Sequence, residues 1–458
     1  MERERKNTVT EISYILQQEE GTTEKTDSLS SLPQALFNYI NSIVGSGIIG
    51  IPYAFHRAGF GLGLLLLVIV AAITDYSLIL MVRCGHISGR FSYPGIMEAA
   101  YGKWGYYVLS LLQFCYPFLA MISYNVVVGD TLTAVLMRFL PASSISMGTV
   151  RFFVVFTVTV FLVLPLCLYK NISRLARASF ISLAFICIIL FAVILKFISG
   201  DYDVVPSVDN SWQFANKDVI PATGIMAFAF MSHHNTFLVY QSMRDATLEK
   251  WEQVTHISIG FAWVVAALFG IAGYATFRGL SQGDLLENYC WGDDLMNFVR
   301  VLFSISILLT FPIECFVSRE IVKNQIHRYK SNATDPVEYE KDSDPVHAVG
   351  DINDDLSNKI TLAIVLTAFF ISPLTDCLGP VLELNGLLAA IPLAYILPGL
   401  AYIQMESHSL FSREKLPAVG LVAFGTVVTL AGAGLLLKNL TGDCKSNIVL
   451  DYCQNYGS

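Results

Sequence analysis

The stretch Asn41-Ser42-Ile43-Val44-Gly45-Ser46-Gly47-Ile48-Ile49-Gly50-Ile51-Pro52 interrupts the first long apolar segment of this 458-residue chain. Three glycines and a proline fall within the eight residues 45–52, and polar side chains cluster at the same depth. Inside a membrane every backbone N–H and C=O needs a partner, so a broken helix is tolerated only where protein or a polar cavity surrounds it. The stretch therefore predicts a discontinuous helix at a binding site, with close helix packing through small residues as the alternative.

The composition indicates that the chain crosses a membrane many times. Hydrophobic residues make up 54% of it and charged residues 14%, and the mean hydropathy is +0.55. Typical soluble domains carry about 25% charged residues, so we predict an all-helical polytopic protein whose surface faces the lipid bilayer. The formal net charge of −8 argues against a nucleic-acid partner, which needs clustered cations. Protein partners cannot be named from the sequence.

Apolar stretches of about 20 residues, long enough to cross a hydrocarbon core as helices, occur eleven times. Lysine and arginine concentrate in alternate connections, which predicts a cytoplasmic N-terminus and a C-terminus outside the cell or in a lumen. The sequence does not separate a plasma membrane from an endolysosomal one. The predicted spans are 33–56, 62–82, 106–137, 150–168, 179–198, 220–241, 254–277, 297–317, 360–379, 382–404 and 417–437.

The parts outside the spans are predicted to be accessory. Residues 331–358 hold eight acidic residues and one lysine with few large apolar groups, so this cytoplasmic loop is expected to be disordered, as is the N-terminal segment 1–32. The short non-cytoplasmic tail 438–458 contains Cys444 and Cys453, and a disulfide between them is expected in an oxidising compartment.

The sixth span carries a second interruption at the same distance from its start. Aligning Pro33 with Pro221 places Val44–Gly47 opposite Ser232–Asn235. Two discontinuous helices separated by five spans are typical of two inverted five-helix repeats, with the binding site between the breaks near the middle of the membrane. The two repeats and the additional eleventh helix are predicted at 33–198, 220–404 and 417–437.

The two breaks supply the predicted substrate site. The free N–H and C=O groups of half-helix ends suit the carboxylate and the ammonium group of an amino acid. Because neither break contains Asp, Glu, Lys or Arg, a neutral amino acid is expected. No recognisable spacing of nucleophile and base suggests an enzyme. The predicted substrate-binding residues are Val44, Gly45, Ser46, Gly47, Phe230, Ser232 and His233.

The eighth span supplies a candidate cation site. Ser306 and Thr310 are four residues apart and share a helix face. Pro312 has no N–H, so the Leu308 carbonyl loses its usual partner. Hydroxyl and carbonyl oxygens suit a small hard cation such as sodium, whereas no organic cofactor is expected. The alternative is that both hydroxyls bond back to the preceding turn.

Two adjacent histidines, His233 and His234, lie in the second break and can titrate near neutral pH. They leave a proton-coupled or sodium-independent transporter open as an alternative. A nutrient sensor that binds an amino acid with little flux is the other alternative.

Two acidic residues inside spans, Asp75 and Glu314, are interpreted as structural. Both lie toward predicted cytoplasmic ends, where Arg83 and Arg319 respectively are close in sequence. Intramembrane charges are usually paired, so we expect these two ion pairs.

The sequence segments at these interruptions resemble those of the sodium-coupled neutral amino acid transporters, within the wider amino acid and auxin permease group. The resemblance covers all eleven predicted spans. The runs that carry it are 41–52, 228–230 with Ser232 and His233, 310–312, 120–125, 283–290 and 376–379.

The resemblance implies a leucine-transporter-type inverted five-plus-five repeat and transport of neutral amino acids with sodium, in some members against a proton. Family members bind sodium through an Asn of the first helix and a Thr of the eighth, which match Asn41 and Thr310. Ile43 and Ser306 complete the predicted sodium ligands. The family's sixth-helix histidine matches His233, whereas many members have proline where this chain has His234.

Overall fold

The computed structural model describes residues 30–139, 146–168, 172–202, 212–331, 354–374, 378–439 and 452–453. Across these residues the chain is helical, apart from loops and one isolated bridge between Ser30 and Met243. Eight helices in the described ranges are long and apolar enough to cross a membrane, and a ninth span forms if the bent pair Leu32–Ile43 and Ser46–Ala58 is counted as one. The predicted class, an all-helical membrane protein, is confirmed.

Each predicted span overlaps helix. The two that fall outside those nine are the sixth, whose halves are each shorter than a full span, and the ninth, which begins with three charged residues among its first six. The helices are α2 (Leu32–Ile43) with α3 (Ile51–Ala58), α4 (Phe60–Ser88), α5 (Tyr93–Met137), α6 (Met147–Val158) with α7 (Leu164–Leu168), α8 (Ile172–Ser199), α9 (Val219–Ala229) with α10 (Thr236–Ser242), α11 (Leu248–Phe277), α12 (Asp294–Ser331), α13 (Asp354–Ile371), α14 (Leu378–Asn385) with α15 (Leu397–Met405), and α16 (Leu416–Asn439).

Two predicted boundaries differ from the structure. The acidic connection was predicted to reach residue 358, but α13 already begins at Asp354; residues 332–353 and 1–29 lie outside the described ranges. The ninth helix ends at Ile371 rather than near 379, and a 3-10 turn over Ser372–Leu374 follows it. Pro373 explains this early end, because its ring disfavours the helical conformation of the residue before it.

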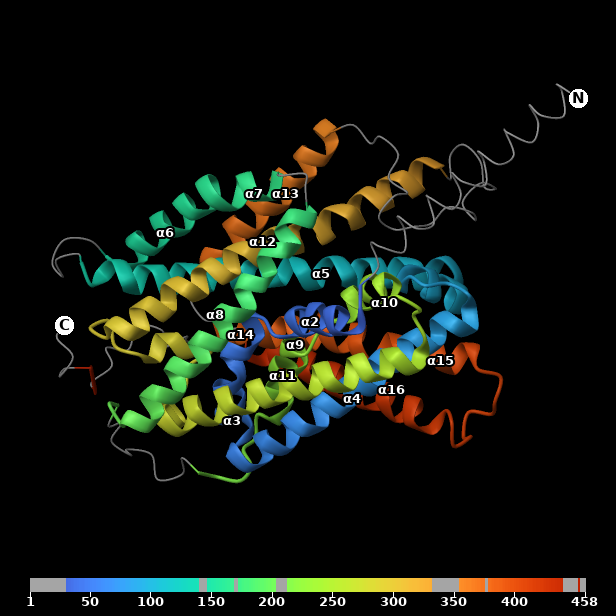
Figure 1. The fold of residues 1–458 in the computed structure, drawn as a ribbon, viewed down its shortest axis with the longest axis horizontal. Coiled ribbons are helices and arrows are strands. Elements are labelled where there is room, and N and C mark those ends of the chain that lie inside the picture. Colours follow the sequence, from blue (N-terminus) through green and yellow to red (C-terminus); the bar gives the residue numbers. More distant parts are fainter. Residues whose placement is uncertain are drawn as a thin grey trace, which may run out of the picture.

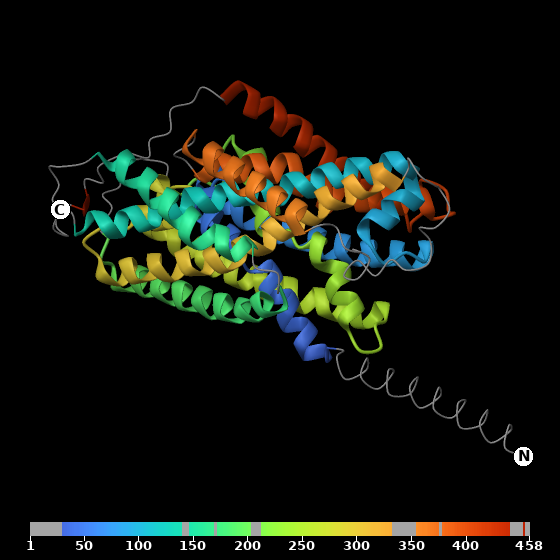
Figure 2. The same ribbon diagram turned by 90° about the horizontal axis from the view of Figure 1, so that it is seen from above.

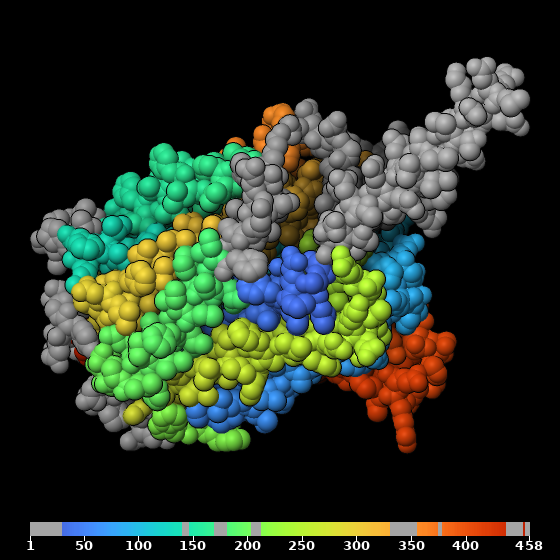
Figure 3. All heavy atoms as spheres, viewed as in Figure 1, coloured from blue at the N-terminus to red at the C-terminus, as the bar shows by residue number. Residues whose placement is uncertain are grey.

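The first helices of the two predicted repeats differ in how deeply they lie in the bundle (Figure 1). α9 packs against α3, α4 and α14, and nearly all of its residues are buried. α2 is more peripheral: Figure 3 shows part of it (blue) at the surface, flanked by α8 (green) and by α10 and α11 (yellow-green). The broken helices therefore meet at the centre while α2 reaches outward.

α16 lies at the rim of the bundle (Figure 2, dark red). Only 22% of its most apolar window is buried, against 72% for the helix Leu378–Met405. This position agrees with a helix that is additional to the two predicted repeats.

The disulfide differs from the prediction. Cys453 bonds to Cys290, with their Cα atoms 5.5 Å apart, so the predicted Cys444–Cys453 pair is wrong. Cys444 itself lies outside the described residues. The Tyr452 hydroxyl donates to the Asn288 carbonyl oxygen at 2.8 Å, which holds the tail against the connection between α11 and α12. The partner lies 163 residues away in sequence, so no local spacing could reveal it.

Candidate substrate and cation site

The first predicted break is present. α2 ends at Ile43, Val44 and Gly45 have extended backbone, and the helix resumes as a 3-10 turn over Ser46–Gly50 that leads into α3. The two halves are bent by 44°. A helix that restarts leaves its first N–H groups without partners in a preceding turn, so the backbone of this break can bind a carboxylate.

The second predicted break is also present. α9 ends at Ala229, and a 3-10 turn over His233–Asn235 precedes α10. Both interruptions thus fall within two residues of the positions in which the alignment of the two spans placed them.

The two breaks touch each other. A Cβ added at Gly47 would lie 2.6 Å from the Ala229 Cα, a distance that real Cβ atoms do not reach. Asn235 Nδ2 donates to Ser42 Oγ at 2.7 Å. The first break therefore approaches the second backbone to backbone, and only glycine fits at position 47.

A tyrosine that sequence reasoning missed joins α2 to the second break. The Tyr39 hydroxyl lies 3.1 Å from Ser232 Oγ and 3.2 Å from Thr236 Oγ1. The ring is fully buried and packs edge-on against Trp251, with centroids 5.0 Å apart. The signal in the sequence was weak, because one tyrosine in an apolar helix is usually a packing residue.

The hydrogen bonds of His233 fix its tautomer. The Ser77 hydroxyl donates to the Ala394 carbonyl oxygen, since a carbonyl oxygen can only accept. Ser77 Oγ therefore accepts the N–H of His233 Nε2, 3.2 Å away. In the neutral imidazole this leaves Nδ1 as an acceptor, and that atom is buried without a hydrogen-bond partner among the described residues.

His234 has the opposite tautomer. Asn235 Nδ2 donates one hydrogen to Ser42 and the other to His234 Nε2 at 3.0 Å. The proton of neutral His234 must then be on Nδ1, which is also buried and unpartnered within the described ranges. Adjacent histidines thus present one unpaired acceptor and one unpaired donor in the same break.

The predicted substrate-binding residues differ in how exposed they are. Gly45 and Ser46 are partly exposed, as expected for groups that a substrate must reach. The others are buried between the helices: Val44, Gly47, Phe230, Ser232 and His233.

The predicted sodium ligands are only partly brought together. The Thr310 hydroxyl donates back to the carbonyl oxygens of Ser306 (3.2 Å) and Ile307 (3.0 Å), as the alternative interpretation expects, so toward other groups its oxygen acts as an acceptor. Among the described residues no hydrogen bond joins Asn41 to α12. Tyr124 of α5 connects the first break to α12, because its hydroxyl lies beside those of Ser46 and Thr310. No sequence pattern singles out this tyrosine. Ser306 and Ile43 are buried.

Neither expected ion pair of the intramembrane acids forms. Asp75 pairs with His256 at 2.7 Å, not with Arg83. Arg319 makes its ion pair with the next residue in the chain, 3.7 Å away, and not with Glu314. Helix rotation explains both errors, because sequence proximity does not place two side chains on one face.

A cluster of ion pairs lies at the C-terminal end of α3. Arg57 lies 2.9 Å from Asp218, which precedes α9, and 3.3 Å from Glu383 of α14. The cluster connects the second half of the first broken helix to the start of the other.

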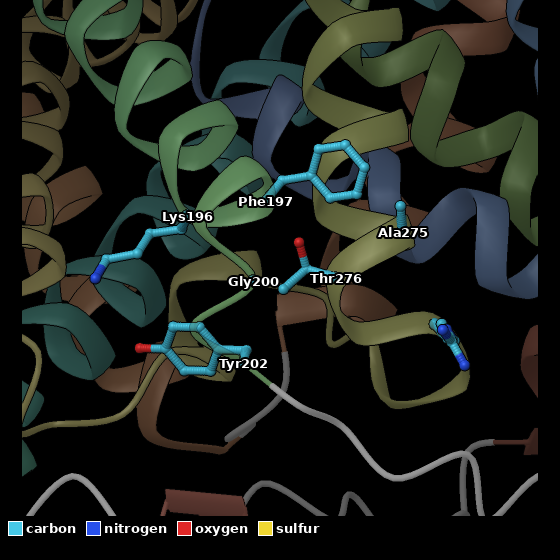
Figure 4. A pocket seen from close by; sticks show the side chains of 7 residues that line it. Lys196, Phe197, Gly200, Tyr202, Ala275 and Thr276 are labelled. Carbon is cyan, nitrogen blue, oxygen red and sulfur yellow. The ribbon is translucent and has the colours of Figure 1, made fainter.

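A surface pocket lies elsewhere, between the end of α8 and α11 (Figure 4). Lys196 and Tyr202 line it, and Lys196 pairs with Asp201 and Asp293 at 2.8 Å each. None of its lining residues belongs to either break, so we assign it no role in transport.

Sequence comparison decides the family. The family described as transmembrane amino acid transporter protein matches residues 28–437. The chain belongs to this family. It is a transporter family, so the protein is not an enzyme.

Two relatives and one solved structure are informative. The chain is 42% identical to the Danio rerio protein named "Putative sodium-coupled neutral amino acid transporter 11", over 93% of this chain and 90% of the relative. It is 31% identical to vacuolar amino acid transporter 2 of Saccharomyces cerevisiae, over 88% and 82%. Its fold is similar to that of MhsT, solved in complex with L-phenylalanine, with a TM-score of 0.56 at 13% identity over 87% and 97%. The leucine-transporter-type fold is thereby confirmed.

Proposed function

We propose that this protein is a secondary active transporter that moves a neutral amino acid across a membrane together with sodium. The observation that carries the proposal is that the two broken helices meet at their breaks, through Gly47 against Ala229 and through Asn235 with Ser42. Free half-helix ends at such a junction are what an amino acid zwitterion requires.

The substrate is proposed to bind with its two charged groups on opposite partners. His233 Nδ1 and the carbonyl groups that end α2 accept from the ammonium group. The N–H groups after Gly45 and His234 Nδ1–H donate to the carboxylate. No charged residue lies in either break to pair an ionised substrate side chain, which supports a neutral amino acid.

Sodium is proposed to bind between the first broken helix and α12. Thr310 offers lone pairs there, with Asn41, Ile43 and Ser306 as the further ligands expected from the sequence. The printed name of the Danio rerio relative supports this coupling. Moving one charge inward through 100 mV supplies about 2.3 kcal/mol, to which the chemical gradient of sodium adds.

We further propose eleven membrane spans in two inverted repeats, 33–198 and 220–404, with the N-terminus in the cytoplasm. The matching registers of the two breaks support the repeats. The Cys290–Cys453 disulfide supports an oxidising compartment for the tail, on the same side as the α11–α12 connection.

The test is uptake of a labelled neutral amino acid mixture into proteoliposomes, with sodium and then choline as the outside cation. The proposal predicts uptake in sodium and its loss in choline. Uptake that persists in choline and follows a pH step would replace sodium by protons, with His233 and His234 as carriers. Saturable binding without uptake in either medium would indicate a sensor.

A further inference from the structure

Within the described part of the bundle the carboxylate of Glu314 has no partner. Glu314 of α12 has a buried Oε2 with no hydrogen bond, and no oppositely charged side chain of the described residues lies near it. The residue as a whole is partly exposed. An unpaired carboxylate in a membrane span is costly to maintain and marks a functional position.

Glu314 lies close in sequence to the part of α12 that faces the first break. It follows Thr310 by four residues, so the two side chains share a helix face. The hydroxyl of Tyr124 lies beside those of Ser46 and Thr310. Glu314 therefore lies one helical turn from a group of three hydroxyls that the first break, α5 and α12 supply.

We propose that Glu314 is the anionic ligand of the co-transported sodium ion, in a site centred on Thr310, to which Ser46 and Tyr124 contribute in addition to the ligands expected from the sequence. This inference rests on the sodium coupling proposed above. The charge of sodium compensates the carboxylate, and hydroxyl oxygens are the neutral ligands that a hard cation takes. A bound proton would satisfy Glu314 alone and would leave the three neighbouring hydroxyls without a role.

The donor and acceptor assignments favour a cation at this place. The Thr310 proton is used within its own helix, so toward its neighbours this hydroxyl can only accept or coordinate. Among the described residues Glu314 has no cationic side chain beside it, whereas Asp75 pairs with His256 and Glu383 pairs with Arg57.

The test is Glu314→Gln in proteoliposomes, with Glu320→Gln as matched control. Glu320 lies on the same helix but is ion-paired with Lys323 at 3.1 Å, away from the site. Glu314→Gln should raise the sodium concentration for half-maximal uptake by about tenfold or more. The amino acid KM at saturating sodium should stay near the wild-type value, and the control should keep the wild-type sodium requirement.

Three results would overturn the inference. The first is an unchanged sodium requirement in Glu314→Gln together with lost pH dependence, which would make Glu314 a proton carrier. The second is an unchanged sodium requirement with a changed preference between lysine and neutral amino acids, which would make it a substrate contact. The third is an unchanged sodium requirement in Tyr124→Phe, the variant to use if Glu314→Gln does not fold.

Different results would show whether the sodium coupling itself or only the role of Glu314 is wrong. If wild-type uptake does not need sodium, the proposed coupling fails. If the wild type needs sodium and the Gln variant needs it equally, only the assignment of Glu314 fails.

Discussion

Both breaks interrupt a helix at the same junction, but different kinds of residues form them. The first is made by glycines and offers mainly backbone groups, and its fit depends on the missing Cβ of Gly47. The second is made by His233, His234 and Asn235, and its side chains are held by hydrogen bonds to α4 and α2. The first break is thus fixed by steric fit and the second by hydrogen bonding, so substitutions in the two should fail differently.

The largest effect is expected at the steric contact. Gly47→Ala places a methyl group against the Ala229 backbone, which cannot move aside as a flexible side chain would. A displacement of about 1 Å between the breaks should lower uptake by about 100-fold. Uptake per folded protein in proteoliposomes measures this.

The control for that variant is Gly260→Ala in α11, where an added Cβ meets nothing within 4 Å. It should keep wild-type uptake. Near-normal uptake by Gly47→Ala would show that the breaks do not need their close contact.

A smaller effect is expected from the hydrogen bond that orients His233. Ser77→Ala removes the acceptor of Nε2–H, so the imidazole can change tautomer and Nδ1 is no longer held as an acceptor. We expect the amino acid KM to rise about tenfold, the cost of one misplaced buried hydrogen bond. The pH profile of KM should also shift, and Ser77→Thr, which keeps a hydroxyl, should restore much of the loss. Equal damage by Ala and Thr would indicate a packing role instead.

A modest effect is expected where α2 is joined to the second break. Tyr39→Phe keeps the packing against Trp251 but removes the hydroxyl that bonds Ser232 and Thr236. Thermal unfolding of the purified protein should show a loss of about 1 kcal/mol, with a few-fold change in uptake at most. Abolished uptake in a stable variant would mean that this hydroxyl contacts the substrate.

The smallest effect on transport is expected far from both breaks. Burial and the charge of Asp130 raise the pKa of Asp284, in the α11–α12 connection, to about 7. Because the folded state binds this proton more tightly, the resulting stabilisation is complete below about pH 4 and is lost as the pH rises through about 7. Asp284→Asn should therefore flatten the decline of thermal stability between acidic and neutral pH.

Asp355→Asn, at an exposed surface position, is the control and should leave that decline unchanged. An unaltered pH slope in Asp284→Asn would contradict the assignment to Asp284.

The sequence predicted the breaks because glycine, proline and polar groups in an apolar segment violate a strong physical rule of membranes. Ser77, Tyr39 and Tyr124 could not be predicted, since each lies in a regular helix and acquires its role only from partners on other helices, far away in the chain.

The wrong disulfide and the wrong ion pairs have the same cause. Spacing along the chain suggested Cys444 for Cys453, and Arg319 for Glu314, whereas the fold supplied Cys290 for the one and no cation for the other. Local spacing predicts helix faces well and distant partners poorly.

The most direct test of the central claim, that the two breaks together form the substrate site, is equilibrium binding of a labelled neutral amino acid to the purified protein in sodium. The account predicts saturable binding by the wild type and by Gly260→Ala, and its loss in Gly47→Ala. Equal binding by folded Gly47→Ala and wild type would contradict it, because the substrate would then not lie between the breaks.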